Sequence, residues 1–166
     1  MTDEASSSKA AEVGGTAQDP RTLPWAPNGD GPRDEAEAVA LARLRGVVIP
    51  EDIAFHFRDD LVPDGAYGIY NTFASFKDYR WSDFYAKGRI NVKLRRSVLE
   101  SDEAIVAVIA HEMFELNALR ALFEVRQTIP GLEIIATVRT SVPRNLHDRA
   151  WDAADQIVMA MRREAT

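Results

Sequence analysis

The chain has 166 residues, 46% of them hydrophobic, which is enough for one ordinary hydrophobic core and too few for two. Its formal net charge of −6 argues against nucleic acid and anionic membrane surfaces as partners. The sequence contains no cysteine, so disulfides, thiolate metal sites and cysteine nucleophiles are excluded. Any bound metal must therefore be held by His, Asp or Glu side chains.

The sequence also bears on where the chain works. The longest apolar run, from Ala104 to Ala110, is much shorter than the roughly 20 residues that cross a bilayer. The N-terminus begins with acidic residues and has no apolar segment of the signal-peptide type. We therefore expect a cytoplasmic protein, or one that is exported without a Sec signal, and no membrane partner.

The first 33 residues differ in composition from the rest of the chain. Residues 1–33 are rich in Ala, Ser, Gly and Pro and have few large apolar side chains. Such a segment cannot bury enough apolar surface to offset the entropy lost on ordering. We therefore predict a disordered tail over residues 1–33, with Trp25 as its one docking point. A single domain over residues 34–166 follows it.

The first elements of this domain are predicted from capping and periodicity. An acidic first turn and a basic last turn predict a helix over about residues 35–45. Apolar residues then alternate with polar ones, which predicts two strands, over residues 53–58 and 67–73, joined around the turn Pro63-Asp64-Gly65. Strict alternation after Gly88 predicts a third strand over residues 89–95.

The second half of the chain is predicted to be mostly helical. Ser101-Asp102-Glu103 is typical of a capped helix start and predicts a long helix over about residues 102–125. Residues 132–139 fit a strand or a helix equally well, and Asn145 is expected to cap a last amphipathic helix. The predicted fold is therefore α+β, with a small sheet of about three strands packed on the long helix and a C-terminal helix.

Three ionisable side chains lie on the apolar side of the predicted long helix. At about 100° per residue, His111, Glu112 and Glu115 fall within the apolar arc of this helix. An ionisable group in a core costs free energy unless it is paired, hydrogen-bonded or bound to a metal. His111 and Glu115 are four residues apart, so both can bind one ion. A buried polar network and a metal-free catalytic site are the alternatives.

A third metal ligand must come from elsewhere in the chain. The sequence has three histidines, and those outside the long helix are His56 and His147. His147 begins the last helix, where it can lie over the long one, and we predict it as the third ligand. His56 alternates with phenylalanines and is expected to point away from the core. Asp148 and Asp152 are one turn apart and could orient an imidazole or bind the metal themselves.

The order of the third strand, a short connection and the helix with Ala110-His111-Glu112-Met113-Phe114-Glu115 resembles the minimal core of zincin metallopeptidases. It is also similar to toxin-like domains at the C-terminal ends of bacterial polymorphic toxins. The resemblance implies that His111 binds zinc, that Glu112 is the general base, and that residues 90–94 form an edge strand holding an extended substrate. Glu115 stands where the motif has His, and a carboxylate is a harder ligand. The site is therefore a variant that binds zinc or another divalent transition metal, or it binds none.

The sequence thus predicts a metal-dependent hydrolase, with peptide-bond hydrolysis as the expected reaction. Glu112 would take the proton from a metal-bound water. Its partner would be a peptide or protein substrate, and a protein inhibitor would be a further partner of a toxin-like domain. The alternative is a non-catalytic binding or effector module whose buried residues form a structural network or hold a structural metal. The oligomeric state stays open.

Overall fold

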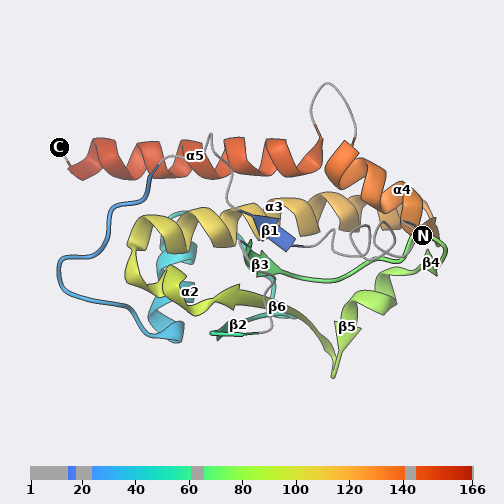
Figure 1. Cartoon of the computed structure of the whole chain (residues 1–166), viewed down its shortest axis with the longest axis horizontal. Coiled ribbons are helices and arrows are strands. Elements are labelled where there is room, and N and C mark those ends of the chain that lie inside the picture. The colour runs from blue at the N-terminus through green and yellow to red at the C-terminus, as the bar shows by residue number, and fades with distance from the viewer. Residues whose placement is uncertain (1–14, 18–23, 61–65, 141–144, 166) are drawn as a thin grey trace, which may run out of the picture.

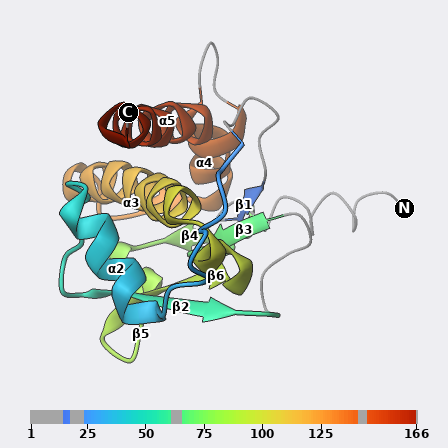
Figure 2. The same ribbon diagram turned by 90° about the vertical axis from the view of Figure 1, so that its left-hand side faces the viewer.

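The computed structural model describes residues 15–17, 24–60, 66–140 and 145–165, and the α+β fold class is confirmed. The long helix α3 (Asp102–Val125) lies between the C-terminal helix α5 (Leu146–Ala165) and a small sheet (Figures 1 and 2). Helix α2 (Glu35–Leu44) packs beside α3 on the flank of the sheet. Because α3 is covered from several sides, it forms the centre of the molecule.

The main sheet is built around β6 (Arg89–Arg95), the strand that precedes α3. On one side β2 (Ile53–Arg58) pairs with it in parallel. On the other side β3 (Ala66–Ile69) and β5 (Tyr85–Ala86) pair with it antiparallel, at different points along its length. The outer edge of β3 pairs antiparallel with β1 (Gly15–Ala17). The strand order is therefore β1-β3-β6-β2.

The remaining elements are short and connect the larger ones. They are β4 (Asp78–Tyr79), the 3-10 helix Trp81–Phe84, the 3-10 helix Arg96–Glu100, β7 (Ile129–Pro130), α4 (Gly131–Ile135) and the π-helical segment Ala136–Thr140. Strand β4 pairs antiparallel with β7 to form a second, two-stranded sheet. The region over 132–139, which fitted a strand or a helix, is thus helical.

Local sequence signals account for the main elements. On β6, Ile90, Val92 and Leu94 are fully buried while the intervening side chains are not, so the predicted apolar face is confirmed. Helix α3 begins after Ser101, whose hydroxyl oxygen accepts a hydrogen bond from the Ala104 N–H. Both the start and the end of this helix match the prediction.

The predicted pairing of strands is wrong. The segments over 53–58 and 67–73 are not hairpin neighbours, because β6 lies between β2 and β3. The second of these strands also ends earlier than predicted, at Ile69. The predicted turn over 63–65 lies outside the described residues. Alternation marks a segment as a strand but does not choose its neighbour, because strands pair through their backbone edges, and β6 offers one edge to β2 and the other to β3.

Residues 90–94 are likewise not an edge strand. β6 is paired along its length with β2 and, on its other side, with β5 at Arg89 and Ile90 and with β3 at Lys93 and Leu94. It is therefore not free to hold the extended substrate that the zincin resemblance implies. Among the described strands, β1, β2 and β5 each have one strand neighbour in this sheet. The substrate role expected for residues 90–94 is therefore ruled out by the sheet topology.

Residues 24–33, which the sequence assigns to the tail, pack against the domain. The ring centroid of Trp25 lies 4.9 Å from that of Tyr67 and 6.0 Å from that of Trp151, which confirms Trp25 as a docking point. Arg33 donates to both oxygens of Asp102, at 2.8 and 3.0 Å. These contacts are mainly polar and aromatic, so a count of apolar residues misses them. Residues 1–14 and 18–23 lie outside the described residues.

Candidate metal centre

The ionisable residues of α3 lie where the helix is most enclosed. His111 and Glu112 are 0% exposed and Glu115 is 1% exposed, which confirms their predicted burial. The helix places them there because the sheet covers one side of α3 and α5 covers another (Figure 2). Three buried ionisable groups in just over one turn demand compensation from their surroundings.

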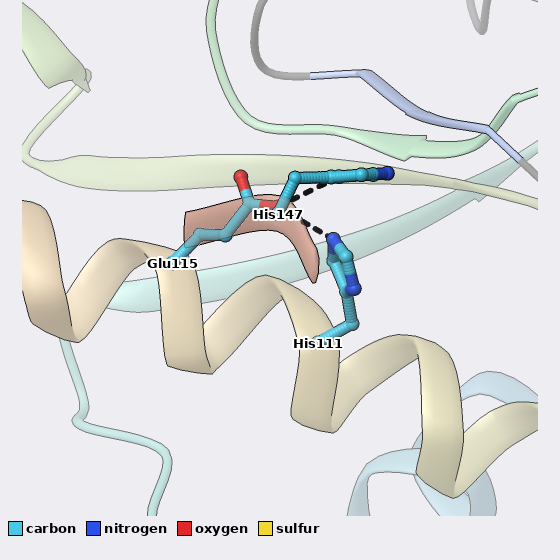
Figure 3. Close-up of side chains that lie close together, drawn as sticks. All are labelled: His111, Glu115 and His147. Atoms are coloured by element: carbon cyan, nitrogen blue, oxygen red, sulfur yellow. Dashed lines mark hydrogen bonds and ion pairs between the residues drawn. The ribbon is translucent and has the colours of Figure 1, made fainter. Parts of the chain in front are cut away.

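Helix α5 brings a third group to this position. His147, in the first turn of α5, points its Nδ1 at Glu115 Oε2 over 3.2 Å, while His111 Nε2 lies 2.6 Å from the same oxygen (Figure 3). One ligand atom from each of the three residues lies within 4.8 Å of the others. Asn145 fixes the start of α5, since its side-chain oxygen accepts from the Asp148 N–H at 2.7 Å.

The donor set fits a transition metal. Two imidazole nitrogens and one carboxylate oxygen are ligands that zinc and its neighbours accept, and three protein ligands leave a coordination position open. In the described part of the chain, neither ring nitrogen of His111 has a hydrogen bond of ordinary geometry, although Nε2 is close to Glu115. A buried imidazole whose nitrogen approaches a carboxylate without a well-formed hydrogen bond is suited to share a cation with it.

The protonation states also suit a metal. Burial lowers the pKa of His111 below its ordinary value of 6.5, and the nearby Glu115 carboxylate only partly opposes this effect. Burial raises the pKa of Glu115, but the neighbouring His111 and His147 outweigh it and lower this pKa. The attraction from His111 acts while its imidazole is protonated, and a bound cation would take its place once the imidazole is neutral. A neutral imidazole and an ionised carboxylate are the forms that bind a metal.

Tyr70 is a part of the centre that sequence reasoning missed. Its hydroxyl donates to Glu115 Oε1 at 2.8 Å, so the other carboxylate oxygen is left facing the two histidines. Burial raises the pKa of Tyr70 well above its ordinary value, which keeps this donor protonated. Tyr70 follows β3 and is far from α3 in sequence, so no spacing rule connects it to Glu115. A hydroxyl in this position can fix the orientation of the Glu115 carboxylate.

Glu112 lies beside the three converging residues but is not one of them. Its Oε2 is 4.0 Å from His111 Nε2. Its Oε1 faces β3 so closely that a Cβ atom added to Gly68 would lie 2.8 Å from it. Glycine at this position therefore lets the β3 backbone pass directly over the Glu112 carboxylate.

The other candidates from the sequence are placed elsewhere. His56 Nε2 lies 2.8 Å from Asn91 Oδ1, on the side of the sheet opposite to the β6 face that α3 covers. His56 therefore lies away from the centre, as the sequence predicted. Asp148 and Asp152 do not belong to the group of described residues that could hold a metal. On the α5 side, the ring of Trp151 lies 4.4 Å from that of His111 and forms an apolar wall.

Comparison of the chain with protein-family models, with curated proteins and with solved structures finds no match. Among the described helices, none is both long enough and apolar enough to cross a membrane. The functional argument therefore rests on the geometry of the residues themselves.

Proposed function

We propose that this chain is a metal-dependent hydrolase that cleaves peptide bonds. His111, Glu115 and His147 would hold one divalent transition metal, with zinc as the first choice, and Glu112 would be the general base. The observation that carries the proposal is the convergence of two imidazoles and one carboxylate inside the core, with a second carboxylate beside them. The resemblance to zincins and to toxin-like domains agrees with it.

Each residue has a definite part in this mechanism. The metal, when bound, supplies Lewis acidity and lowers the pKa of a bound water. Glu112 would accept a proton from a water molecule at the centre, and the β3 backbone passes directly over its carboxylate. Tyr70 orients Glu115 through its hydroxyl, and Trp151 keeps bulk water away from the imidazole of His111.

One observation favours a second function. His111 and Glu115 are almost completely enclosed, which is typical of a structural metal site in a non-catalytic binding or effector module. Such a module would hold the same ion, but Glu112 would serve only the local polar network. Changing Glu112 therefore separates the two functions.

The test is the variant Glu112→Gln, which keeps the shape of the side chain and removes the proton acceptor. We expect the bound metal and the melting temperature to stay close to those of the parent, while peptide hydrolysis falls about a hundredfold or more. Metal content is measured by elemental analysis, and hydrolysis with a library of unstructured peptides. Glu124→Gln, on the exposed side of the same helix, is the matched control and should change none of these.

Two results would contradict the proposal. Protein that contains no metal after purification without chelators, and gains no stability from added zinc, manganese, nickel or iron, has no metal centre. Metal-loaded protein that hydrolyses nothing, and in which Glu112→Gln costs about 1–3 kcal/mol of stability, has a structural centre instead.

A further inference from the structure

The edge of β3 that faces away from β6 is occupied by the chain's own N-terminal segment. Strand β1 pairs with it antiparallel, with Gly15 opposite Ile69, Thr16 opposite Gly68 and Ala17 opposite Ala66. The pairing covers nearly the whole length of β3. Because strands pair mainly through backbone hydrogen bonds, this edge accepts an added strand of almost any sequence.

This edge lies next to the candidate general base. Gly68, the middle partner in the pairing with β1, is the residue whose missing Cβ makes room for Glu112 Oε1. The Thr16 backbone is thus only one strand away from the contact between β3 and Glu112. An extended chain at the place of β1 would therefore lie one strand away from the Glu112 carboxylate.

The same segment also contacts α5. Trp25 packs on Tyr67 of β3 and on Trp151 of α5, and Trp151 in turn contacts the ring of His111. The Pro24 carbonyl accepts from Arg162, and the Ala26 N–H donates to Glu103 at 2.9 Å. The N-terminal segment therefore contacts both β3 and α5, the elements that carry Gly68 and His147.

We infer that the outer edge of β3 is a binding site for an extended polypeptide, and that β1 and Trp25 occupy it as a resident competitor. The chain would then regulate its own site, because a substrate has to displace β1. A strand of three residues is short enough to be displaced, while Trp25 keeps the segment close to the edge. The link to hydrolysis rests on the proposed function, whereas the binding itself does not.

The test uses the full chain with Gly15→Pro, Thr16→Pro and Ala17→Pro combined. Prolines have no backbone N–H and are not tolerated inside a paired strand, so β1 is expected to leave β3. The matched control carries Ser6→Pro, Ser7→Pro and Ser8→Pro, outside β1. Both are made with Glu112→Gln, so that the probe is not consumed. The probe is a fluorescein-labelled peptide copying residues 12–20, followed by anisotropy.

We expect the strand-breaking variant to bind the probe about tenfold more tightly than the parent, because the resident strand no longer competes for the site. The control should bind like the parent. Amide hydrogen exchange over 66–69 should be faster in the strand-breaking variant and slow down again when the probe is added. Thr16→Pro alone serves as a milder variant, should the triple change lower the melting temperature, and should give a smaller effect of the same sign.

Equal probe affinity in the parent and the strand-breaking variant, or unchanged exchange over 66–69, would overturn the inference. The two proposals can fail separately. With Glu112 restored, peptide hydrolysis should rise by a factor similar to the gain in affinity. Tight probe binding without hydrolysis in any variant would leave the polypeptide site intact and reject the hydrolase. Metal-dependent hydrolysis that is unchanged by the proline substitutions would support the hydrolase and reject the polypeptide site.

Discussion

Two polar clusters on α3 show how differently charged groups can be accommodated. Near the C-terminal half of the helix, Arg120 donates to Asp52 at 2.9 Å, Tyr85 donates to the same carboxylate at 2.5 Å, and the guanidinium lies over the Trp81 ring. Both donors there meet Asp52 Oδ2, whereas Asp52 Oδ1 has no hydrogen-bond partner among the described residues, and the groups are partly exposed. This Arg120 cluster pairs a carboxylate with a guanidinium and joins the 3-10 helix Trp81–Phe84 to α3.

The centre around Glu115 differs in its burial and in its groups. It is buried, and two imidazoles approach one carboxylate, while neither ring nitrogen of His111 has a hydrogen bond of ordinary geometry among the described residues. A metal ion bound between the three residues would supply a positive charge to the centre without the cost of protonating a buried imidazole. The two clusters therefore predict different responses to added metal, and this difference can be tested.

The largest expected effect is on metal binding. His111→Ala removes a ligand from the buried centre, so we expect metal content after dialysis to fall from about one ion per chain to near zero, and hydrolysis with it. Asp52→Asn, which weakens the Arg120 cluster, should leave metal content unchanged and cost at most about 1 kcal/mol. Elemental analysis and chemical denaturation of both variants give the answer. Full metal content in His111→Ala would show that the ion is held by other residues.

A smaller effect is expected for the group that orients Glu115. Tyr70→Phe removes only the hydroxyl that donates to Oε1, so we expect the affinity for zinc to fall about tenfold to a hundredfold. Tyr85→Phe removes the corresponding hydroxyl from the other cluster and is the matched control, with no change in zinc affinity. Competition with a chromogenic chelator measures both. Identical affinities in the two variants would remove Tyr70 from the centre.

The smallest effect concerns the exposed ion pairs that hold the N-terminal segment. Hydrogen bonds from Arg162 lower the pKa of Glu103 below 4.5, and those from Arg33 lower the pKa of Asp102 below 3.8. Since both values are lower in the folded chain, their contribution to stability is present above these pH values and is lost as pH falls further. Both pairs are partly exposed to solvent, so the loss should be at most about 1 kcal/mol.

This effect is measured as denaturant stability at pH 6 and pH 3 for the parent and for Glu103→Gln, with Glu164→Gln as the exposed control. The parent should lose more stability on acidification than Glu103→Gln does. A larger loss in the variant would mean that Glu103 does not hold the segment through its charge. Quenching of tryptophan fluorescence should increase over the same pH range, as Trp25 becomes exposed.

The sequence predicted those features that depend on local periodicity. The bounds of α3, its capping by Ser101 and the burial of His111 all follow from the pattern of one helix. The choice of His147 over His56 followed from the alternation in β2, which turns His56 away from the core. The sequence could not provide contacts between segments that are distant in the chain. These are the order of the strands, the hydrogen bond from Tyr70 to Glu115, and the packing of residues 24–33 on the domain.

The residues that converge on Glu115 come from two helices that are separated by β7, α4 and the π-helical segment. An ion held by His111, Glu115 and His147 would therefore close a loop of the chain between α3 and α5. Such a cross-link removes conformations from the unfolded chain, as a disulfide does, in a sequence that has no cysteine to form one. Removal of the ion by a chelator should then release α5 first, before the sheet loses its packing on α3.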